Sequence, residues 1–237
     1  MATMFTAPVY YPCTALMRIL LIGLTRWRVR GKENVPAKGP LIIVANHLHA
    51  VDPPLLGASI PRRIAFMAKD ELFNSWLGAL VRGFGAFPVR RNQLDRQALS
   101  QANAVLKKGL ALGIFPEGER SRSSQLQPGL LGAAHVALRS GAPILPVGIT
   151  GMEKLEGFTS ILRRPEITVT IGRPFTPPSP DGKVTRDLLN SLTDLMMVSI
   201  ARLLPPSYQG VYHKDDWEQL EEVGSLAGEG IGDRESP

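Results

Sequence analysis

Short apolar, β-prone segments alternate with helical patterns along residues 30–205, and this alternation constrains the fold more than any other feature of the chain. Strands are expected over residues 40–46, 63–69, 85–89, 111–115, 143–150 and 166–172, and helices over 52–60, 70–84, 94–109, 130–142 and 185–204. Strands separated by helices of this length favour βαβ crossovers, in which neighbouring strands run parallel. The sequence therefore predicts an α/β fold: a single domain with a mostly parallel central sheet flanked by helices.

Two of the expected loops are rich in polar side chains. Residues 46–52, "NHLHAVD", leave the strand at 40–46, and residues 116–121, "PEGERS", leave the strand at 111–115. Loops beyond the carboxyl ends of parallel strands are where α/β proteins normally bind ligands. Because loops rich in specific polar groups commonly carry function, both are expected to contribute to an active or binding site.

His47 and Asp52 are five positions apart across the first of these strand-to-helix loops. With Asp52 at the helix N-cap, a hydrogen bond from the imidazole would fix its tautomer and leave the other ring nitrogen free to remove a proton. No G-x-S-x-G motif is present and Cys13 is isolated, so such a base would act on the acceptor's own hydroxyl. Two alternatives remain open here: Asp52 only caps the helix while His47 binds backbone groups, or His47 and His49 form a metal pair.

Arginines follow two of the strands. Arg90 and Arg91 end the segment "GAFPVRR", and Arg120 lies in "FPEGERSRS" beside Glu117 and Gly118. Arginine forks bind phosphate oxygens bidentately, and a glycine permits a positive φ or a close backbone approach. Glu117 could orient an arginine or accept a substrate hydroxyl. Ordinary surface ion pairing is the alternative for all of these charges.

Charge is distributed unevenly along the chain, whose formal net charge is +6. Residues 214–237 carry two basic and eight acidic side chains, so the remainder has a net charge of +12. The acidic end is typical of a solvated, disordered tail. The basic remainder implies an anionic partner, either a phospholipid surface, a phosphate-bearing small molecule or nucleic acid. Nucleic acid is disfavoured, since no basic-aromatic or helix-turn-helix arrangement is present.

The first 30 residues combine an apolar stretch with a basic end. The uninterrupted apolar part, Ile19–Leu24, is far shorter than the ~20 residues that a spanning helix needs. The basic residues that follow at once are Arg26, Arg28, Arg30 and Lys32. This pattern is typical of an amphipathic helix lying in an anionic bilayer surface, and a helix docked on the core is the alternative. We therefore expect a membrane-associating segment at 1–30, a globular domain at 31–205 and an acidic tail at 206–237.

Taken together, these stretches resemble the glycerophospholipid acyltransferase family, which includes the 1-acyl-sn-glycerol-3-phosphate acyltransferases. "NHLHAVD" resembles the family's first block, H-x4-D, with His47 and Asp52 in the catalytic places. "GAFPVRR" resembles the second block, which places Gly85 and Arg91 in its conserved positions. "FPEGERS" resembles the third block, with Glu117, Gly118 and Arg120, and "ILPVGI" resembles the fourth, centred on Pro146. The resemblance covers about residues 30–175. It departs from the family at Glu119, where threonine is usual, and at Arg90, where acidic residues often occur.

The resemblance implies an enzyme that moves a fatty acyl group from acyl-CoA or acyl-carrier protein to the free hydroxyl of 1-acylglycerol-3-phosphate, giving phosphatidic acid. It implies that His47, oriented by Asp52, deprotonates that hydroxyl, and that residues 31–205 are the acyltransferase domain. The residues implied to bind the phosphate or shape its pocket are Arg91, Glu117, Gly118 and Arg120. Supporting roles are expected for Asn46, Lys69, Gly85, Arg90 and Pro146.

The same resemblance implies no metal and no redox cofactor, with the acyl thioester as co-substrate. The implied partners are lysophosphatidic acid and an anionic membrane surface, at the cytoplasmic face. A lone cysteine agrees with a reducing compartment. Two alternatives are a related acyltransferase that accepts glycerol-3-phosphate or another lysolipid, and a non-catalytic lipid-binding protein.

Overall fold

The computed structural model describes residues 7–74, 78–89, 96–155, 163–179 and 183–213. Its centre is a seven-stranded sheet with the order β1-β7-β6-β2-β5-β3-β4. The strands are β1 (Arg26–Arg30), β2 (Leu41–Ala45), β3 (Ile64–Lys69), β4 (Ala86–Val89), β5 (Ala111–Ile114), β6 (Ile144–Thr150) and β7 (Glu166–Ile171). All neighbouring strands pair in parallel except β6 and β7, which are antiparallel. The predicted single α/β domain with a mostly parallel sheet is confirmed.

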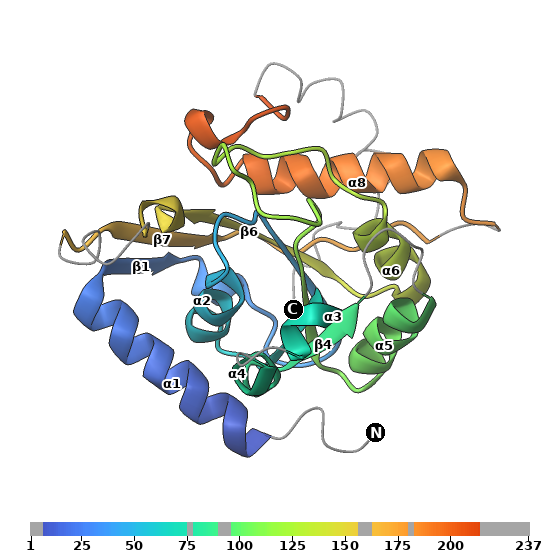
Figure 1. Cartoon of the computed structure of the whole chain (residues 1–237). Helices are drawn as coiled ribbons and strands as arrows, with labels where there is room; N and C mark the ends of the chain where they lie inside the picture. The colour runs from blue at the N-terminus through green and yellow to red at the C-terminus, as the bar shows by residue number, and fades with distance from the viewer. Residues whose placement is uncertain (1–6, 75–77, 90–95, 156–162, 180–182, 214–237) are drawn as a thin grey trace, which may run out of the picture.

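Helices cover both faces of the sheet (Figure 1). The helices are α1 (Ala7–Leu24), α2 (Asp52–Ser59), α3 (Asp70–Phe73), α4 (Gly78–Gly83), α5 (Arg96–Lys107), α6 (Gly132–Ser140) and α8 (Arg186–Ala201). One hydrophobic cluster joins the sheet to α5, α6 and α8, and a second joins it to α1, α2 and α3. Successive residues of β2 alternate between the two clusters, because side chains along a strand point to opposite faces. Its continuous apolar run is therefore buried on both sides.

The sheet begins earlier than the sequence predicts. Residues 26–30, expected in the N-terminal segment, form β1 and pair with β7 along its length. Trp27 and Val29 pack on the core, while the three arginines that alternate with them are exposed. One of these, Arg28, forms an ion pair of 3.3 Å with Glu166. The basic cluster expected behind a membrane helix is thus the exposed side of an edge strand. This period-2 alternation is the pattern of a half-buried strand.

The helix predicted over residues 70–84 is also wrong, since α3 ends at Phe73 and α4 begins at Gly78. The α4 helix packs back against the end of α3. Arg82 donates from Nη2 to the carbonyl of Phe73 at 3.1 Å, and a Cβ at Gly78 would collide with that same carbonyl. Two short helices therefore replace one, and only part of the expected apolar stripe is buried: Phe73 is buried, whereas Leu80 is exposed.

Residues 206–213, expected in the acidic tail, pack against the domain instead. Gln209 is buried and donates from its side chain to the carbonyls of Ala201 and Leu204. Tyr212 is also buried, and its hydroxyl accepts the N–H of Gly129 at 3.0 Å. These contacts extend the folded domain past α8. The rest of the expected tail, residues 214–237, lies outside the described residues.

Candidate active site

The two polar loops lie at the carboxyl ends of β2 and β5, which are neighbours in the sheet. They are joined by two hydrogen bonds: Ser121 donates its backbone N–H to the carbonyl of His47 at 2.8 Å, and His47 donates its own N–H to Glu117 Oε1 at 2.9 Å. On the other side, Asn46 exchanges two hydrogen bonds with the backbone of Ile149, at 2.9 and 2.7 Å. The loop that carries His47 is therefore fixed to its neighbours from both sides.

The imidazole of His47 is bonded to a buried carboxylate. His47 Nδ1 lies 2.8 Å from Oδ2 of Asp52, whose side chain is 0% exposed, and the ring stacks on Phe115 with centroids 4.1 Å apart. The same Oδ2 accepts the backbone N–H groups of Leu48 and His49 at 2.7 Å each. Because the ionised carboxylate can only accept, Nδ1 carries the hydrogen and Nε2 keeps a free lone pair. The hydrogen bond that the sequence predicts between these two side chains is therefore present, and its geometry suits a base with an orienting group.

Asp52 is not the N-cap that the sequence predicts. The helix α2 begins at Asp52 itself, and no side chain caps it. A capping carboxylate would accept the N–H of the second or third residue after it. Pro54 has no N–H, and the N–H of Leu55 already donates to the carbonyl of Val51 at 2.9 Å. The carboxylate therefore turns back to the preceding loop, where three donors meet it.

Glu117 is 4% exposed and connects the two loops. Its Oε1 accepts from His47, and its Oε2 accepts the backbone N–H of Gln127 at 3.1 Å. Burial raises the pKa of this carboxyl from its ordinary value to about 7, while the two N–H donors oppose the rise and the charge of Asp52 adds to it. Both carboxylate oxygens of Glu117 thus accept backbone N–H groups, and none of the arginines in the described part of the chain forms an ion pair with it.

Gly118 has the positive φ that the sequence allows for, +74°. Its N–H donates to the carbonyl of Phe115 at 3.0 Å, which closes the turn after β5. The turn needs a glycine there because other residues rarely adopt this backbone conformation. Gly118 thus shapes the loop, and its own N–H is already bonded within it.

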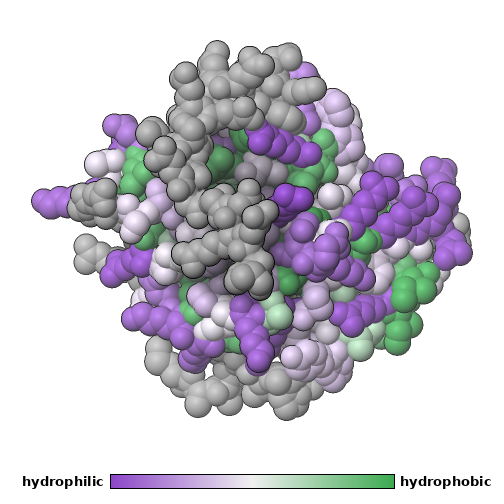
Figure 2. Space-filling view, turned by 180° about the vertical axis from the view of Figure 1, so that it is seen from behind, coloured by the Kyte–Doolittle hydropathy of each residue, from purple (hydrophilic) through white to green (hydrophobic). Residues whose placement is uncertain are grey.

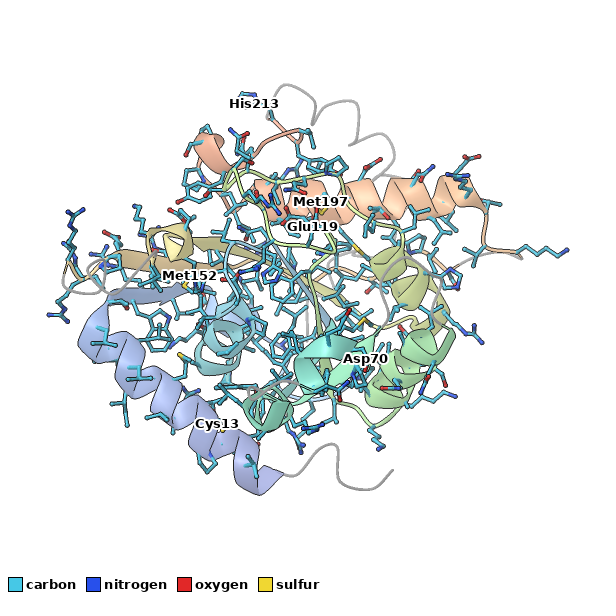
Figure 3. The ribbon with its side chains drawn as sticks, in the orientation of Figure 1. Cys13, Asp70, Glu119, Met152, Met197 and His213 are labelled. Atoms are coloured by element: carbon cyan, nitrogen blue, oxygen red, sulfur yellow. The ribbon has the colours of Figure 1, made fainter. Side chains whose placement is uncertain are left out.

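A cavity of about 850 Å³ opens in front of His47. Its apolar lining consists of Leu48, Ala50, Pro53, Met67, Ala68, Leu72, Phe115 and Leu155. Its polar lining adds His49, Glu119, Arg120, Ser121, Arg122, Ser124 and Glu153 to His47. Figure 3 shows Glu119, on the loop between β5 and α6, and Met152, at the start of the turn that leads to Glu153. The lining of the cavity therefore combines apolar side chains with two arginines and two glutamates.

The remaining predicted site residues fall into two groups. Pro146 lies inside β6, paired with Val44, and Gly85 has a φ of +76° in the turn before β4. Neither of these two lines the cavity. Arg90 and Arg91 lie outside the described residues, and the side chain of Lys69, at the end of β3, is not described. Arg120 is therefore the predicted phosphate ligand that the structure places in the cavity.

Arg122, which follows Arg120 in the predicted cluster "FPEGERSRS", also lines the cavity. The sequence does not identify Glu153 or Leu155 as cavity residues, and it considers His49 only as a metal ligand. The first two are about a hundred positions from His47, on the segment that follows β6, and no motif marks them. Among the described residues, no group of three or more His, Cys, Asp or Glu side chains is placed to hold a metal ion. His49 turns its Nδ1 to the backbone of Val51, away from a shared ligand role.

Comparisons with known proteins agree with this geometry. A family model described as acyltransferase matches residues 26–150, which include the strands from β1 to β6. A curated Bacillus subtilis protein, 1-acyl-sn-glycerol-3-phosphate acyltransferase, is 32% identical over 168 residues, 70% of this chain and 82% of the relative. A Borreliella burgdorferi protein of the same name is 32% identical over 50% of this chain and 49% of its own length. The chain thus spans about half of that second relative.

A solved structure has the same fold. It is the 1-acyl-sn-glycerophosphate (LPA) acyltransferase PlsC from Thermotoga maritima, with a TM-score of 0.61 and 24% sequence identity. The match covers 82% of this chain and 78% of that one. At this identity the likeness concerns the fold, and it supports the sheet and helix arrangement described above.

Proposed function

The chain belongs to the acyltransferase family, and on this premise we propose that it transfers a fatty acyl group to the free hydroxyl of 1-acylglycerol-3-phosphate, giving phosphatidic acid. The observation that carries the proposal is the His47–Asp52 pair at the edge of a cavity that also holds Arg120. The names of the curated relatives supply the acceptor. The acyl donor is a thioester, either of coenzyme A or of acyl-carrier protein.

In the reaction that we propose, Nε2 of His47 removes the proton from the acceptor hydroxyl as its oxygen attacks the thioester carbonyl. The tetrahedral intermediate then expels the thiolate, which takes the proton back from His47. The products are the new ester and a free thiol, and the imidazole returns to its starting state. General-base catalysis of this kind contributes about 10²–10⁴-fold, and Asp52 stabilises the imidazolium while it exists.

Arg120 and Arg122 would bind the phosphate of the acceptor, since both line the cavity and guanidinium groups match phosphate oxygens. Arg91 keeps the phosphate-binding role that its motif implies. Holding the phosphate fixes the glycerol hydroxyl near His47, so a bimolecular encounter becomes a reaction within one complex. The apolar residues of the lining, Met67 and Leu72 among them, suit the acyl chains.

The proposed reaction is tested by mixing the purified chain with oleoyl-CoA and lysophosphatidate and following the release of free thiol. We expect thiol release that depends on lysophosphatidate, together with formation of phosphatidic acid. Glycerol-3-phosphate in a parallel reaction tests the alternative acceptor, and oleoyl-acyl-carrier protein tests the alternative donor. Lipid binding without consumption of either thioester would instead support a non-catalytic lipid-binding protein.

We further propose that α1 lies in an anionic membrane surface at the cytoplasmic face. None of the described helices is long and apolar enough to cross a bilayer. Most of the exposed side chains of α1 are nevertheless apolar, and the large ones are Val9, Tyr11, Leu16, Ile19, Leu20, Ile22 and Leu24. Of its polar side chains, Thr14 is buried, while Arg18 is exposed and its Nε donates to the carbonyl of Ala58 at 2.8 Å. A helix that exposes its apolar side suits a lipid surface, and Figure 2 shows an apolar patch at one edge of the molecule.

Replacing Leu16, Ile19 and Ile22 together with serine should weaken binding to vesicles that contain phosphatidylglycerol by at least about 10-fold. The three side chains would lose their contact with the lipid, while the buried face of α1 is untouched. Flotation of the protein with the vesicles measures the effect. Val211→Ser, which changes an exposed apolar residue outside α1, is the matched control. Equal flotation of the triple variant and the control would contradict a membrane role for α1.

A further inference from the structure

A second imidazole borders the same cavity and is not used by the His47–Asp52 pair. His49 is two positions after His47, and it lines the cavity together with Arg120. Its backbone N–H donates to Asp52 Oδ2 at 2.7 Å, and its carbonyl accepts the N–H of Asp52 at 3.0 Å. The backbone of His49 is therefore held by Asp52, which leaves its side chain available for a separate task.

The tautomer of His49 follows from its neighbour. The backbone N–H of Val51 donates to Nδ1 of His49 at 3.3 Å, so this ring nitrogen is the acceptor. A neutral imidazole that accepts at Nδ1 carries its hydrogen at Nε2. His47 has the opposite arrangement, because its Nδ1 donates to Asp52 and its Nε2 holds a lone pair. One loop thus presents a proton acceptor at one histidine and an N–H donor at the other.

His49 shares the cavity with the side chains that are most suited to an anion. Arg120 and Arg122 line the same cavity and bring two positive charges. Two carboxylates, Glu119 and Glu153, also line the cavity. Glu153 accepts a hydrogen bond from the hydroxyl of Tyr208 at 2.6 Å. Glu119 stands where threonine is usual in the family motif. A phosphate oxygen accepts hydrogen bonds from guanidinium and imidazole N–H groups alike, and such charged acceptors give the stronger bonds.

We propose that His49 is a substrate-binding residue, whose Nε2–H donates a hydrogen bond to the phosphate of the acceptor lipid beside Arg120. This inference rests on the proposed function and extends it with a phosphate ligand in the loop of the base itself. Because His47 and His49 are anchored to the same carboxylate, a phosphate held by His49 sits at a fixed distance from the base. The length of the glycerol unit then determines which hydroxyl reaches His47.

The test compares His49→Phe, which keeps a ring but has no donor, with His49→Gln, whose side-chain N–H lies near the place of Nε2. Binding of hexanoyl-lysophosphatidate is measured by calorimetry without an acyl donor. Loss of a hydrogen bond to a charged group should raise the Kd of His49→Phe about 10-fold or more, and His49→Gln should recover most of the affinity. In steady-state assays of His49→Phe, KM for lysophosphatidate should rise more than kcat falls.

Hexanoylglycerol, which has no phosphate, is the second probe, and the variants should differ little from the wild type in their use of it. Equal loss with both probes would place His49 away from the phosphate and overturn the assignment. Wild-type affinity in His49→Phe, or the same loss in His49→Gln, would also overturn it. A wild-type chain that neither binds nor acylates lysophosphatidate would contradict the proposed function itself, which is a different result. Thermal unfolding of each variant checks that it is folded.

Discussion

His47→Ala is expected to lower turnover by about 10²–10⁴-fold while the chain remains folded. The imidazole is the group placed to take the hydroxyl proton, because its Nδ1 is bonded to Asp52 and its Nε2 is free. Its removal leaves substrate positioning by the arginines in place. The readout is thiol release from oleoyl-CoA at saturating lysophosphatidate, with phosphatidic acid measured as the product.

The fold should survive this change because the other hydrogen bonds that hold the loop do not involve the imidazole. The backbone of His47 bonds to Glu117 and Ser121, and Asp52 keeps the N–H groups of Leu48 and His49. His135→Ala is the matched control, since His135 lies on α6 and lines a separate groove between α5 and α6. Circular dichroism should be unchanged in both variants. Wild-type turnover in His47→Ala would exclude the mechanism.

Glu117→Gln should remove a pH-dependent part of the stability, worth about 3 kcal/mol between pH 4.5 and 8. Burial raises the pKa of Glu117 to about 7, so the folded chain keeps a proton at pH values where the unfolded chain has released it. The contribution of this group is therefore complete below its ordinary pKa and is lost as the pH rises through 7. Glutamine cannot titrate and has no such dependence.

Urea unfolding at several pH values from 4.5 to 8 measures this effect as the difference between the two proteins. The free energy of unfolding of the wild type should fall relative to that of Glu117→Gln as the pH rises. Glu119→Gln changes a neighbouring, exposed carboxylate and should keep the slope of the wild type. Parallel curves for the wild type and Glu117→Gln would show that folding does not shift the pKa of Glu117 and would overturn the prediction.

The parts of the fold that the sequence predicts well are those buried on both sides. The run at Leu41–Ala45 has every side chain buried, and an apolar run of that length between turn signals has few other interpretations. β1 is missed because its arginines follow an apolar stretch at once and are assigned to the basic end of a membrane helix. The alternation of these arginines with Trp27 and Val29 identifies a strand only once the fold is known, because β1 needs β7, which begins at Glu166, as its neighbour in the sheet.

The site divides in a similar way. His47 and Asp52 are close in the chain, so their spacing already predicts the hydrogen bond that the structure confirms. The partners of Glu117 are backbone N–H groups of His47 and Gln127, and a backbone group leaves no trace in the sequence. Asp52 fails as a cap for a local reason, because the prolines that follow it cannot donate. Contacts between loops thus needed the fold, whereas contacts within one loop did not.

The bonds of Asn46 to Ile149 and of Ser121 to His47 have a consequence for substrate choice. They hold the base in place before any lipid arrives, so little ordering of the loop remains to be done on binding. A rigid proton acceptor cannot follow a misplaced hydroxyl. Lipids whose headgroup is too long or too short would therefore occupy the cavity without reacting. Selectivity among them would arise from whether the hydroxyl lies within hydrogen-bond distance of His47, not from a difference in affinity.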